Sequence, residues 1–417
     1  MPRADVVVIG AGLAGLSCAA ELAERGIRVY LAAKGMATTH WMHGGLDVAA
    51  PDGARSFRDG IRLLAAKRGH PYRTLATAAA PAVSTHLARM ASAGLEHVGS
   101  LDDPMRHVPT AIGSRRPAAM VPSAQAAALE PWAGDGLLLI GFKRYRDAWA
   151  PYAARNLEHA RWRGGPPKIR AIEVELPGLN GLHNIAPQIL ARMFEDAAWR
   201  ARALSAIADA LPAGAWRIGM PAVLGLDAHA EVHADAERTL GHRIFEMASL
   251  PPSVPGLRLF EALRRRILTL GGRIQIGFDV VRVERSGHRI TAIHTEAASR
   301  TLRIAGDAFV LATGGIGGAG IRASHDGTLT ERVFDLPIVA PPRERWFSDD
   351  PLRPHPLEAA GIEVDANLAP PELENVRVIG SALPGMHYLD ERCGDGVALA
   401  SAHLAAHSLA RARTVAA

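Results

Sequence analysis

A Gly-x-Gly-x-x-Gly turn lies close to the first residue of the sequence, and its spacing could hold a phosphate. The β-prone apolar residues 6–9 lead into Gly10-Ala11-Gly12-Leu13-Ala14-Gly15, and a helical pattern follows at once. In such a strand–turn–helix unit the first glycine allows the tight turn, the second lets the backbone approach a pyrophosphate, and the third lets helix and strand pack closely. The N–H groups and the dipole of the helix then attract the phosphate. The turn predicts nucleotide or flavin binding; a glycine-rich structural turn is the alternative.

Three histidines are candidates for acid–base chemistry near neutral pH. His40 and His43 lie in the loop after the second predicted strand, and His387 precedes a glycine-rich segment near the end. A packed or exposed histidine is the alternative for each. Loops that closely follow a phosphate-binding turn commonly wrap the cofactor. We therefore expect cofactor contacts from Ala33, Lys34, Thr38, Thr39, Gly44 and Gly45.

Two further glycine-rich turns predict the other walls of the same site. A buried strand over residues 307–312 runs into Ala312-Thr313-Gly314, and a strand over 376–380 leads towards Gly394-Asp395-Gly396 and a helix from Val397. A helix that begins after glycines is a second candidate anion site. The cofactor-binding residues predicted from these segments and from the β-rich region before them are Val281, Ala312, Thr313, Gly314, Gly380, Gly394, Asp395, Gly396 and Val397.

Composition indicates a soluble globular protein with more than one domain. The 417 residues are 48% hydrophobic and 21% charged, with a net charge of +5. That charge is compatible with a small anionic substrate or an anionic surface, while Arg264-Arg265-Arg266 is more typical of a solvated helix face than of nucleic-acid binding. No apolar run is long enough to span a bilayer and no signal segment is recognised, so we expect a cytoplasmic protein.

The two cysteines limit the redox chemistry of the chain. Cys18 and Cys393 provide no disulfide framework and cannot supply the four ligands of an iron–sulfur cluster. No metal site is expected. Any iron–sulfur cluster that acts with this chain would therefore have to lie on another chain.

The order of the elements predicts an α/β fold. A strand over 137–142, helices over 147–161 and 185–211, a strand over 216–221 and a stiff, non-helical proline segment over 249–259 precede a helix to 270. Short strands over 273–276, 279–285, 289–295 and 301–304 follow. We expect a discontinuous Rossmann-like flavin-binding domain from residues 1–70 and 246–417, with a mixed α+β substrate or cap domain inserted over 71–245.

These motifs together resemble the two-dinucleotide-binding-domain flavoproteins. More specifically, residues 37–47 resemble the Ala-Leu-His-Phe-Ser-Ser-Gly-Ser-Leu-Asp loop of the B-subunit family of anaerobic glycerol-3-phosphate dehydrogenase, with His40, Gly44, Leu46 and Asp47 at matching positions. Residues 250–256, Leu-Pro-Pro-Ser-Val-Pro-Gly, and the helix start at 393–398 also resemble that family.

The resemblance implies a flavin, FAD or FMN, and oxidation of sn-glycerol 3-phosphate to dihydroxyacetone phosphate. It also implies a flavoprotein partner and an iron–sulfur partner that anchors the assembly at the inner face of the cell membrane. Arg258 and Arg392 are then candidates to bind the substrate phosphate. A flavin-bearing electron-transfer or assembly protein without its own substrate chemistry is the alternative; a nucleic-acid-modifying flavoprotein is a third hypothesis, suggested only by the net charge.

One residue departs from the dinucleotide-binding pattern. The second strand commonly ends in an acid, about 20 residues past the glycines, that binds the adenosine ribose. Here Ala33 stands at that position, followed by Lys34. Either FAD binds with a different ribose contact or the cofactor is FMN, which has no adenosine; we favour FAD because the glycine turn normally binds a pyrophosphate.

Overall fold

The structure is a computed structural model that describes residues 2–130, 135–162, 167–248, 250–297 and 300–416. The chain forms two compact units. Unit 1 comprises residues 1–39, 47–89 and 260–417, and unit 2 comprises residues 40–46 and 90–259.

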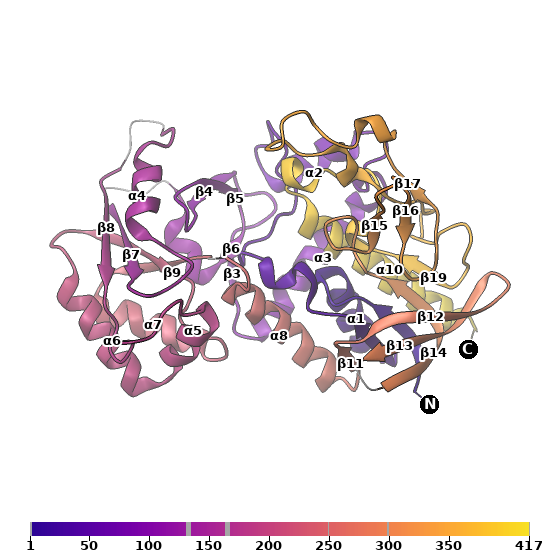
Figure 1. Ribbon diagram of the computed structural model, residues 1–417, viewed down its shortest axis with the longest axis horizontal. Coiled ribbons are helices and arrows are strands. Elements are labelled where there is room, and N and C mark those ends of the chain that lie inside the picture. The colour runs from indigo at the N-terminus through magenta and orange to yellow at the C-terminus, as the bar shows by residue number, and fades with distance from the viewer. Residues whose placement is uncertain (1, 131–134, 163–166, 249, 298–299, 417) are drawn as a thin grey trace. The chain divides into compact units, whose positions relative to one another are not determined.

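Unit 1 is built on a seven-stranded sheet (Figure 1). Its main elements in chain order are β1 Arg3–Ile9, α1 Leu13–Glu24, β2 Val29–Ala33, η1 Ala37–Trp41, α2 Phe57–Ala65, α3 Tyr72–Ser92, α8 Val254–Thr269, β11 Arg273–Ile276, β12 Asp279–Ser286, β13 Arg289–Ala297, β14 Arg300–Leu311, β15 Ile321–Ala323, β16 Leu329–Glu331, β17 Ile338–Val339, η3 Arg343–Arg345, η4 Pro356–Ala359, β18 Gly361–Ile362, β19 Val376–Val378, η5 Gly380–Ala382, α9 Tyr388–Glu391 and α10 Gly394–Ala416. Helices α3 and α8 and the short helix η1 contribute residues to both units.

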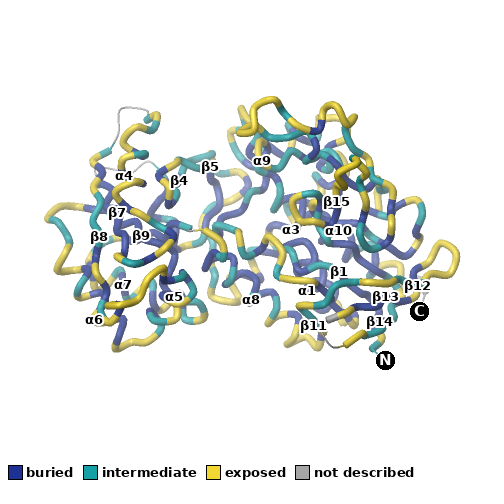
Figure 2. The backbone as a smooth tube through the Cα atoms, viewed as in Figure 1, coloured by how far each residue is buried: buried dark blue, intermediate teal, exposed yellow. Residues whose placement is uncertain are grey.

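The sheet places β1 at its centre. The strand order is β11-β2-β1-β14-β13-β12, with β19 also paired to β14. Strands β11, β2, β1, β14 and β19 pair in parallel, whereas β12, β13 and β14 form an antiparallel meander. Parallel strands covered on both faces need apolar residues on both faces, and residues 4–9 are accordingly all buried. The turn after β12 is exposed, as Figure 2 shows.

Unit 2 has its own sheet, in which all four strands are parallel. Its elements are β3 His97–Val98, β4 Arg106–Pro109, β5 Arg115–Ala118, β6 Val121–Pro122, η2 Ser123–Ala128, β7 Gly136–Phe142, α4 Ala150–Glu158, β8 Ile169–Val174, α5 Pro187–Glu195, α6 Ala197–Ala210, β9 Trp216–Pro221, α7 His229–Leu240 and β10 Arg243–Met247. The four-stranded sheet has the order β10-β9-β7-β8. Along β7, Leu138 and Ile140 pack into one hydrophobic core, and Leu137 and Leu139 pack into another. The period of two explains why an unbroken apolar run forms this doubly covered strand.

The α/β class is confirmed, and several boundaries differ from those expected. The single helix predicted over 185–211 is two helices, because Asp196 ends α5 and its Oδ1 accepts a hydrogen bond from Trp199 N at 2.7 Å, which caps α6. The proline segment becomes helical at Val254 rather than at 259. Pro255 is tolerated there because the first-turn N–H groups of a helix lack intrahelical partners. The strands predicted over 301–304 and 307–312 form one strand, β14.

The boundaries of the two units also differ from those expected at 70/71 and 245/246. The divisions fall at 39/40, 46/47, 89/90 and 259/260. Arg89 near the end of α3 pairs with Glu24 of α1 at 2.6 Å, which ties most of α3 to unit 1. Strand β10 is hydrogen bonded to β9, so the expected boundary at 245/246 would have cut through a strand of the unit 2 sheet.

Candidate functional site

The glycine turn of unit 1 joins β1 to α1 with very little space around two of its glycines. Gly10 has φ +114°, and a Cβ there would overlap the carbonyl oxygen of Ala312. A Cβ on Gly15 would overlap the carbonyl oxygen of Gly10. A Cβ on Gly12 would meet only the Ala37 Cβ, at 3.7 Å. Gly10 and Gly15 are therefore required by packing, whereas Gly12 borders open space.

The amino-terminal end of α1 has the features of an anion site. Its N-cap, Gly12, provides no side-chain hydrogen bond, and the first turn carries no acidic residue. The N–H groups of Leu13 and Ala14, both buried residues, begin the helix at this end. Thr39, which is buried, donates from Oγ1 to the Ala11 carbonyl oxygen at 3.4 Å, while Thr38 is exposed. This end of α1 can therefore accept a phosphate group.

A second wall follows β14. The buried Thr313 hydroxyl makes no hydrogen bond within the described residues. Burying a hydroxyl group without a hydrogen-bond partner is energetically unfavourable. The Thr313 hydroxyl therefore suits contact with a ligand that provides a hydrogen-bond partner. Gly314 has φ +84°, and Gly315 N donates to Ser381 Oγ at 3.2 Å. Gly380 packs against α1, since a Cβ there would lie 2.9 Å from the Ala14 Cβ. The turn, the helix end and the unpaired hydroxyl together fit a phosphate-bearing flavin nucleotide.

The amino-terminal end of α10 is not the open anion site that the sequence predicted. Asp395 N and Gly396 N both donate to the Asp47 carbonyl oxygen at 3.1 Å, and Asp395 Oδ2 accepts from Asp47 N at 2.9 Å. A Cβ on Gly396 would overlap the Tyr72 hydroxyl, and Val397 is buried. The backbone donors of Asp395 and Gly396 thus bind the chain's own loop, and Val397 N donates to the Cys393 carbonyl oxygen.

The end of β2 holds a carboxylate that local sequence did not reveal. The carbonyl oxygen of Ala33 accepts hydrogen bonds from Gly277 N at 2.9 Å and Phe278 N at 3.1 Å. The next residue, Asp279, lies within reach of Lys34, whose Nζ is 3.1 Å from Asp279 Oδ2. Val281, two residues further along β12, is 53% exposed. An acid is therefore present at this strand end, although it does not come from β2.

A buried polar cluster near the start of α10 was also missed. Glu391 pairs with Lys67 at 2.9 Å and with His70 Nε2 at 3.3 Å, and Cys393 Sγ lies 3.8 Å from Glu391 Oε2. Burial opposes ionisation of Glu391, but His70 and Lys67 outweigh it and lower its pKa to about 2. Burial and the nearby Glu391 raise the pKa of the Cys393 thiol, which makes it a poor nucleophile.

This cluster is a buried hydrogen-bond network. The backbone N–H of Tyr72 donates to His70 Nδ1 at 3.1 Å. In a neutral imidazole the other nitrogen, Nε2, then carries the proton and donates to Glu391. The network fixes the loop that enters α10.

In unit 2 the histidine loop and the proline segment are held together. Ser253 N donates to the His40 carbonyl oxygen at 2.7 Å, and Ser253 Oγ donates to the Met42 carbonyl oxygen. Gly44 has φ +97°, and a Cβ there would lie 2.9 Å from the Pro255 Cβ. The two segments with the closest resemblance to the B-subunit family are therefore one structural feature.

The candidate bases differ in what surrounds their ring nitrogens. His40 is half-buried, and its Nδ1 is buried without a hydrogen bond in the described part of the chain. His43 Nδ1 accepts from Gly45 N at 3.2 Å. His387 belongs to unit 1, and its backbone N donates to Glu391 Oε2 at 2.8 Å. The Nδ1 atom of His40 is therefore a candidate proton acceptor.

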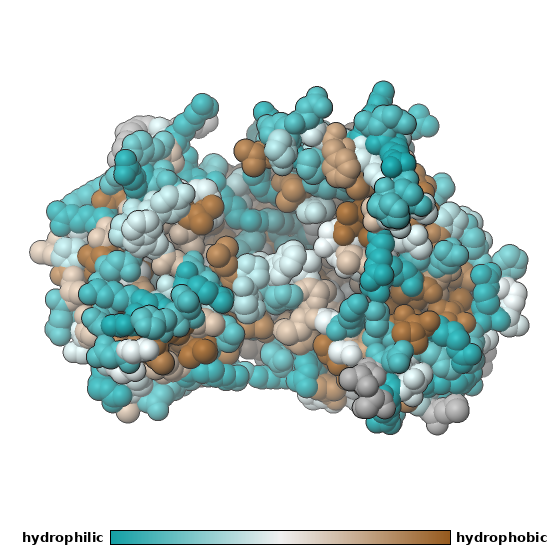
Figure 3. Space-filling model, in the orientation of Figure 1, coloured by the Kyte–Doolittle hydropathy of each residue, from teal (hydrophilic) through white to brown (hydrophobic). Residues whose placement is uncertain are grey.

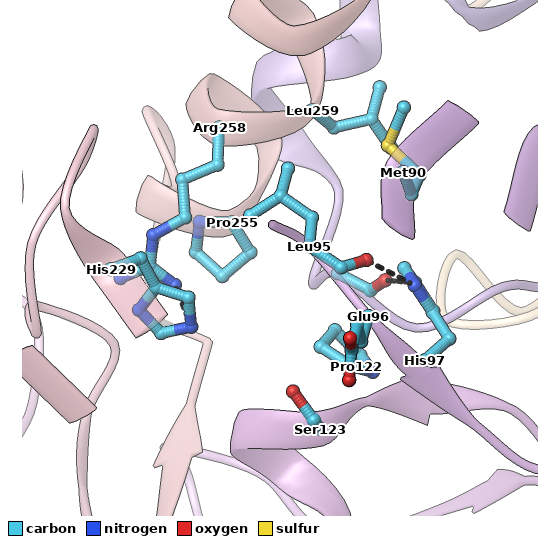
Figure 4. A pocket seen from close by; sticks show the side chains of 11 residues that line it. Met90, Leu95, Glu96, His97, Pro122, Ser123, His229, Pro255, Arg258 and Leu259 are labelled. Atoms are coloured by element: carbon cyan, nitrogen blue, oxygen red, sulfur yellow. Dashed lines mark hydrogen bonds between the residues drawn. The ribbon is translucent and has the colours of Figure 1, made fainter. Parts of the chain in front are cut away.

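A cavity in unit 2 lies beside the proline segment (Figure 4). It is lined by Gly44, Met90, Leu95, Glu96, His97, Pro122, Ser123, His229, Pro255, Arg258 and Leu259. His97 faces two carbonyl oxygens, that of Leu95 from Nδ1 at 3.0 Å and that of Gly44 from Nε2 at 3.1 Å. Burial lowers the pKa of His97, although the two carbonyl oxygens act in the opposite direction.

Arg258 is not available to bind a substrate phosphate. Its guanidinium is buried and donates to both carboxylate oxygens of Glu246, at 2.6 and 3.0 Å, and to the Gly225 carbonyl oxygen at 2.6 and 2.8 Å. Burial opposes the charge on Glu246, but Arg258 and His229 outweigh it and lower its pKa to about 2. Arg258, which was predicted to bind the substrate phosphate, is thus the ion-pair partner of the buried Glu246 carboxylate. No local motif indicated this pairing. Arg392, by contrast, is half-buried with φ +40° and has no side-chain hydrogen bond among the described residues.

Comparison with known proteins identifies relatives over nearly the whole chain. A family model described as an FAD binding domain matches residues 5–397. The probable B-subunit of anaerobic glycerol-3-phosphate dehydrogenase from Halobacterium salinarum is 32% identical over 430 residues, covering 98% of each chain. The B-subunit of the anaerobic enzyme of Yersinia pseudotuberculosis is 31% identical over 428 residues, covering 97% of each chain.

Solved structures are more distant. A chain of Escherichia coli quinol fumarate reductase is 11% identical, with a TM-score of 0.46, and the match covers 100% of this chain and 72% of that chain. A likeness at this level carries no argument about function.

The buried cluster around Arg258 predicts a pH dependence of stability. Burial and Arg258 lower the pKa of His229 from 6.5 to about 4. Between these values the unfolded chain binds a proton that the folded chain does not, so stability falls as the pH decreases through this window. His229→Asn should remove roughly 2–3 kcal/mol of the loss between about pH 7 and pH 4.5. Denaturant unfolding at both pH values measures it; His233→Asn, on the same helix, is the control, and an unchanged loss in His229→Asn would contradict the assignment.

Proposed function

The chain belongs to the FAD-binding domain family and to the B-subunit family of anaerobic glycerol-3-phosphate dehydrogenase, and on that basis we propose that it oxidises sn-glycerol 3-phosphate, or a similar small hydroxy compound, to the ketone. Membership of the family by itself identifies the general class of the protein, an FAD-dependent oxidoreductase. The observation that carries the proposal is the match to the B-subunit relatives over almost the full length, together with a glycine turn whose geometry suits a phosphate.

When FAD is bound, its flavin ring would serve as the acceptor of two electrons. The chain's own residues have to hold its phosphates. In this proposal the N–H groups at the start of α1 bind the pyrophosphate, Gly12 leaves room for it, and the Thr313 hydroxyl gains the hydrogen bond it lacks. Gly10 and Gly15 contribute by letting β1, α1 and β14 approach closely enough to form the turn.

Oxidation of a CH–OH group removes a hydride from carbon and a proton from the hydroxyl, and the proton requires a base. We assign this role to His40, because its Nδ1 is free of hydrogen bonds within the described residues while its backbone is fixed by Ser253. We assign the substrate phosphate to Arg392, whose guanidinium has no internal carboxylate partner among the described residues, unlike that of Arg258.

Electrons have to leave this chain through other proteins in the proposed reaction. The chain has only two cysteines, both buried, so it cannot hold a four-cysteine iron–sulfur cluster. We propose that partner subunits, one with iron–sulfur clusters, pass the electrons to quinone at the membrane. No helix in the described part of the chain has both the length and the apolar character of a membrane crossing. Exposed hydrophobic side chains that partners could cover include Phe347 and Leu352 in unit 1 and Trp149 in unit 2. Hydrophilic residues predominate on the face that Figure 3 shows.

A second candidate function is favoured by the engagement of Arg258. If no residue binds the substrate phosphate, the chain would be a flavin-bearing electron-transfer or assembly protein, and a partner would oxidise the substrate. The two candidates differ in whether the isolated FAD-loaded chain accepts electrons from glycerol 3-phosphate.

Replacing Gly12 tests the phosphate site without disturbing the fold. A Cβ at this position meets no protein atom closer than 3.7 Å, so Gly12→Ala should fold normally, but the methyl group would occupy space next to the proposed pyrophosphate. We expect the Kd for FAD to rise about tenfold or more, whereas the Tm of the flavin-free protein should fall by at most a few degrees, because alanine is a poorer helix N-cap than glycine. Asp307→Ala, which removes an exposed aspartate of β14, is the control and should leave the Kd for FAD unchanged. Unchanged FAD affinity in Gly12→Ala would place the phosphate elsewhere.

Replacing Arg392 tests the substrate phosphate site. Arg392→Met should raise the KM for glycerol 3-phosphate by about tenfold or more, because a charge-assisted contact to phosphate is lost. The rate with glycerol, which has no phosphate, should not change. Arg322→Met, at an exposed arginine on β15, should leave both substrates unaffected. A similar fall with both substrates would argue that Arg392 supports the fold of the site instead.

The decisive experiment uses the purified FAD-loaded chain without partners under anaerobic conditions. Adding glycerol 3-phosphate should bleach the visible absorption band of the flavin, whereas glycerol should bleach it weakly or not at all. Chemical reduction by dithionite shows that the flavin is competent. Bleaching by dithionite but not by glycerol 3-phosphate would reject the proposal and support the electron-transfer function.

A further inference from the structure

We propose that Asp279 accepts hydrogen bonds from the adenosine ribose hydroxyls of FAD, in place of the acid that the second strand lacks. The inference rests on FAD binding by unit 1 and not on the identity of the substrate. It identifies a residue that contacts the adenosine end of the cofactor, which lies beyond the phosphates.

Asp279 lies where this fold binds a ribose. The ribose of a dinucleotide is bound at the carboxyl end of the second strand, where Ala33 offers only a methyl group. Hydrogen bonds from Gly277 N and Phe278 N to the Ala33 carbonyl oxygen bring the start of β12 to this same point. Asp279 is the next residue along the chain. A carboxylate is therefore present where the fold requires one, although it comes from a segment far from β2 in the sequence.

The Asp279 carboxylate is ionised and is held by one of its two oxygens. Its Oδ2 lies 3.1 Å from Lys34 Nζ and 2.9 Å from Arg332 NH2. Partial burial disfavours the charge, but the two cations outweigh it and lower the pKa of Asp279. Both cations contact the same oxygen, and Oδ1 has no hydrogen bond among the described residues. This second oxygen is therefore available to accept from a ligand hydroxyl.

The carboxylate is also accessible to a ligand. The Asp279 side chain is 34% exposed. Gly35, just after Lys34, and Gly277, just before Phe278, border open space, because a Cβ at either position would meet no atom within 4 Å. A carboxylate that served only as the partner of two surface cations would need neither this space nor a free oxygen. The free Oδ1 can therefore accept from the hydroxyl groups of a ribose that lies in this space.

The test compares ligands that contain the adenosine ribose with one that does not. Calorimetric titration of the flavin-free chain would give Kd values for FAD, for ADP and for FMN, which has no adenosine. Asp279→Ala should weaken FAD and ADP by about tenfold and leave FMN within about twofold. Asp307→Ala, which removes another exposed and ion-paired aspartate from unit 1, is the control and should change none of the three.

The Tm of each flavin-free variant separates binding from folding. If Asp279→Ala lowers Tm more than Asp307→Ala, Asp279→Asn provides the comparison, since it keeps the shape and loses the charge; it should weaken FAD and ADP but not FMN. Equal weakening of FAD and FMN, or no weakening of FAD and ADP, would overturn the assignment. Neither result would affect the reduction of the wild-type flavin by glycerol 3-phosphate, so this inference and the proposed function fail independently.

Discussion

The close approach of β1, α1 and β14 at the glycine turn is the constraint on which unit 1 depends. Gly10 lies against the backbone of Ala312, and Gly15 lies against the backbone of Gly10, with no room for a side chain at either position. Because β1 is the central strand and pairs with both β2 and β14, a side chain at either glycine would force apart the middle of the sheet and the helix that covers it. The same approach leaves the first turn of α1 open beside Gly12. Packing and ligand binding are therefore two consequences of one backbone arrangement.

The parts of the fold that could be predicted from the sequence are those that depend on neighbouring residues. The strand, turn and helix at residues 6–24 follow from glycine spacing and from apolar periodicity within one segment, and the structure has β1 and α1 there. The apolar run at 137–142 is a doubly covered strand for a similarly local reason, since alternate residues pack into separate cores. Where a local rule competed with another, the prediction was wrong. Helical periodicity continues across Asp196, but a side chain that caps the next helix ends the first one.

The site residues that could not be predicted are those whose partners are distant in the sequence. Arg258 looks like a phosphate ligand in isolation, but Glu246 and the carbonyl oxygen of Gly225 bind it completely. A buried guanidinium needs a buried carboxylate, and sequence spacing does not show which carboxylate will be buried beside it. The start of α10 shows the same limit: a glycine-rich helix end does attract an anion or an acceptor, but in this chain the acceptor is the carbonyl oxygen of Asp47. Residue type indicates which kind of partner each group requires, and the fold determines which residue supplies that partner.

The same reasoning applies to the assignment of Asp279. The acid expected at the end of β2 is absent, and a segment distant in the sequence supplies a carboxylate instead. The ribose site requires a negative charge at one point in space. The residue at a fixed spacing after the glycines belongs to only one of the segments that could supply this charge. In a sheet ordered β11-β2-β1-β14, the chain that leaves β11 passes the end of β2 before it enters β12, so β12 can supply a side chain there as readily as β2 can. Lys34 and Arg332 stabilise the charge from two further segments. Ala33 therefore does not leave this strand end without an acid, because the topology of the sheet brings Asp279 to the same position.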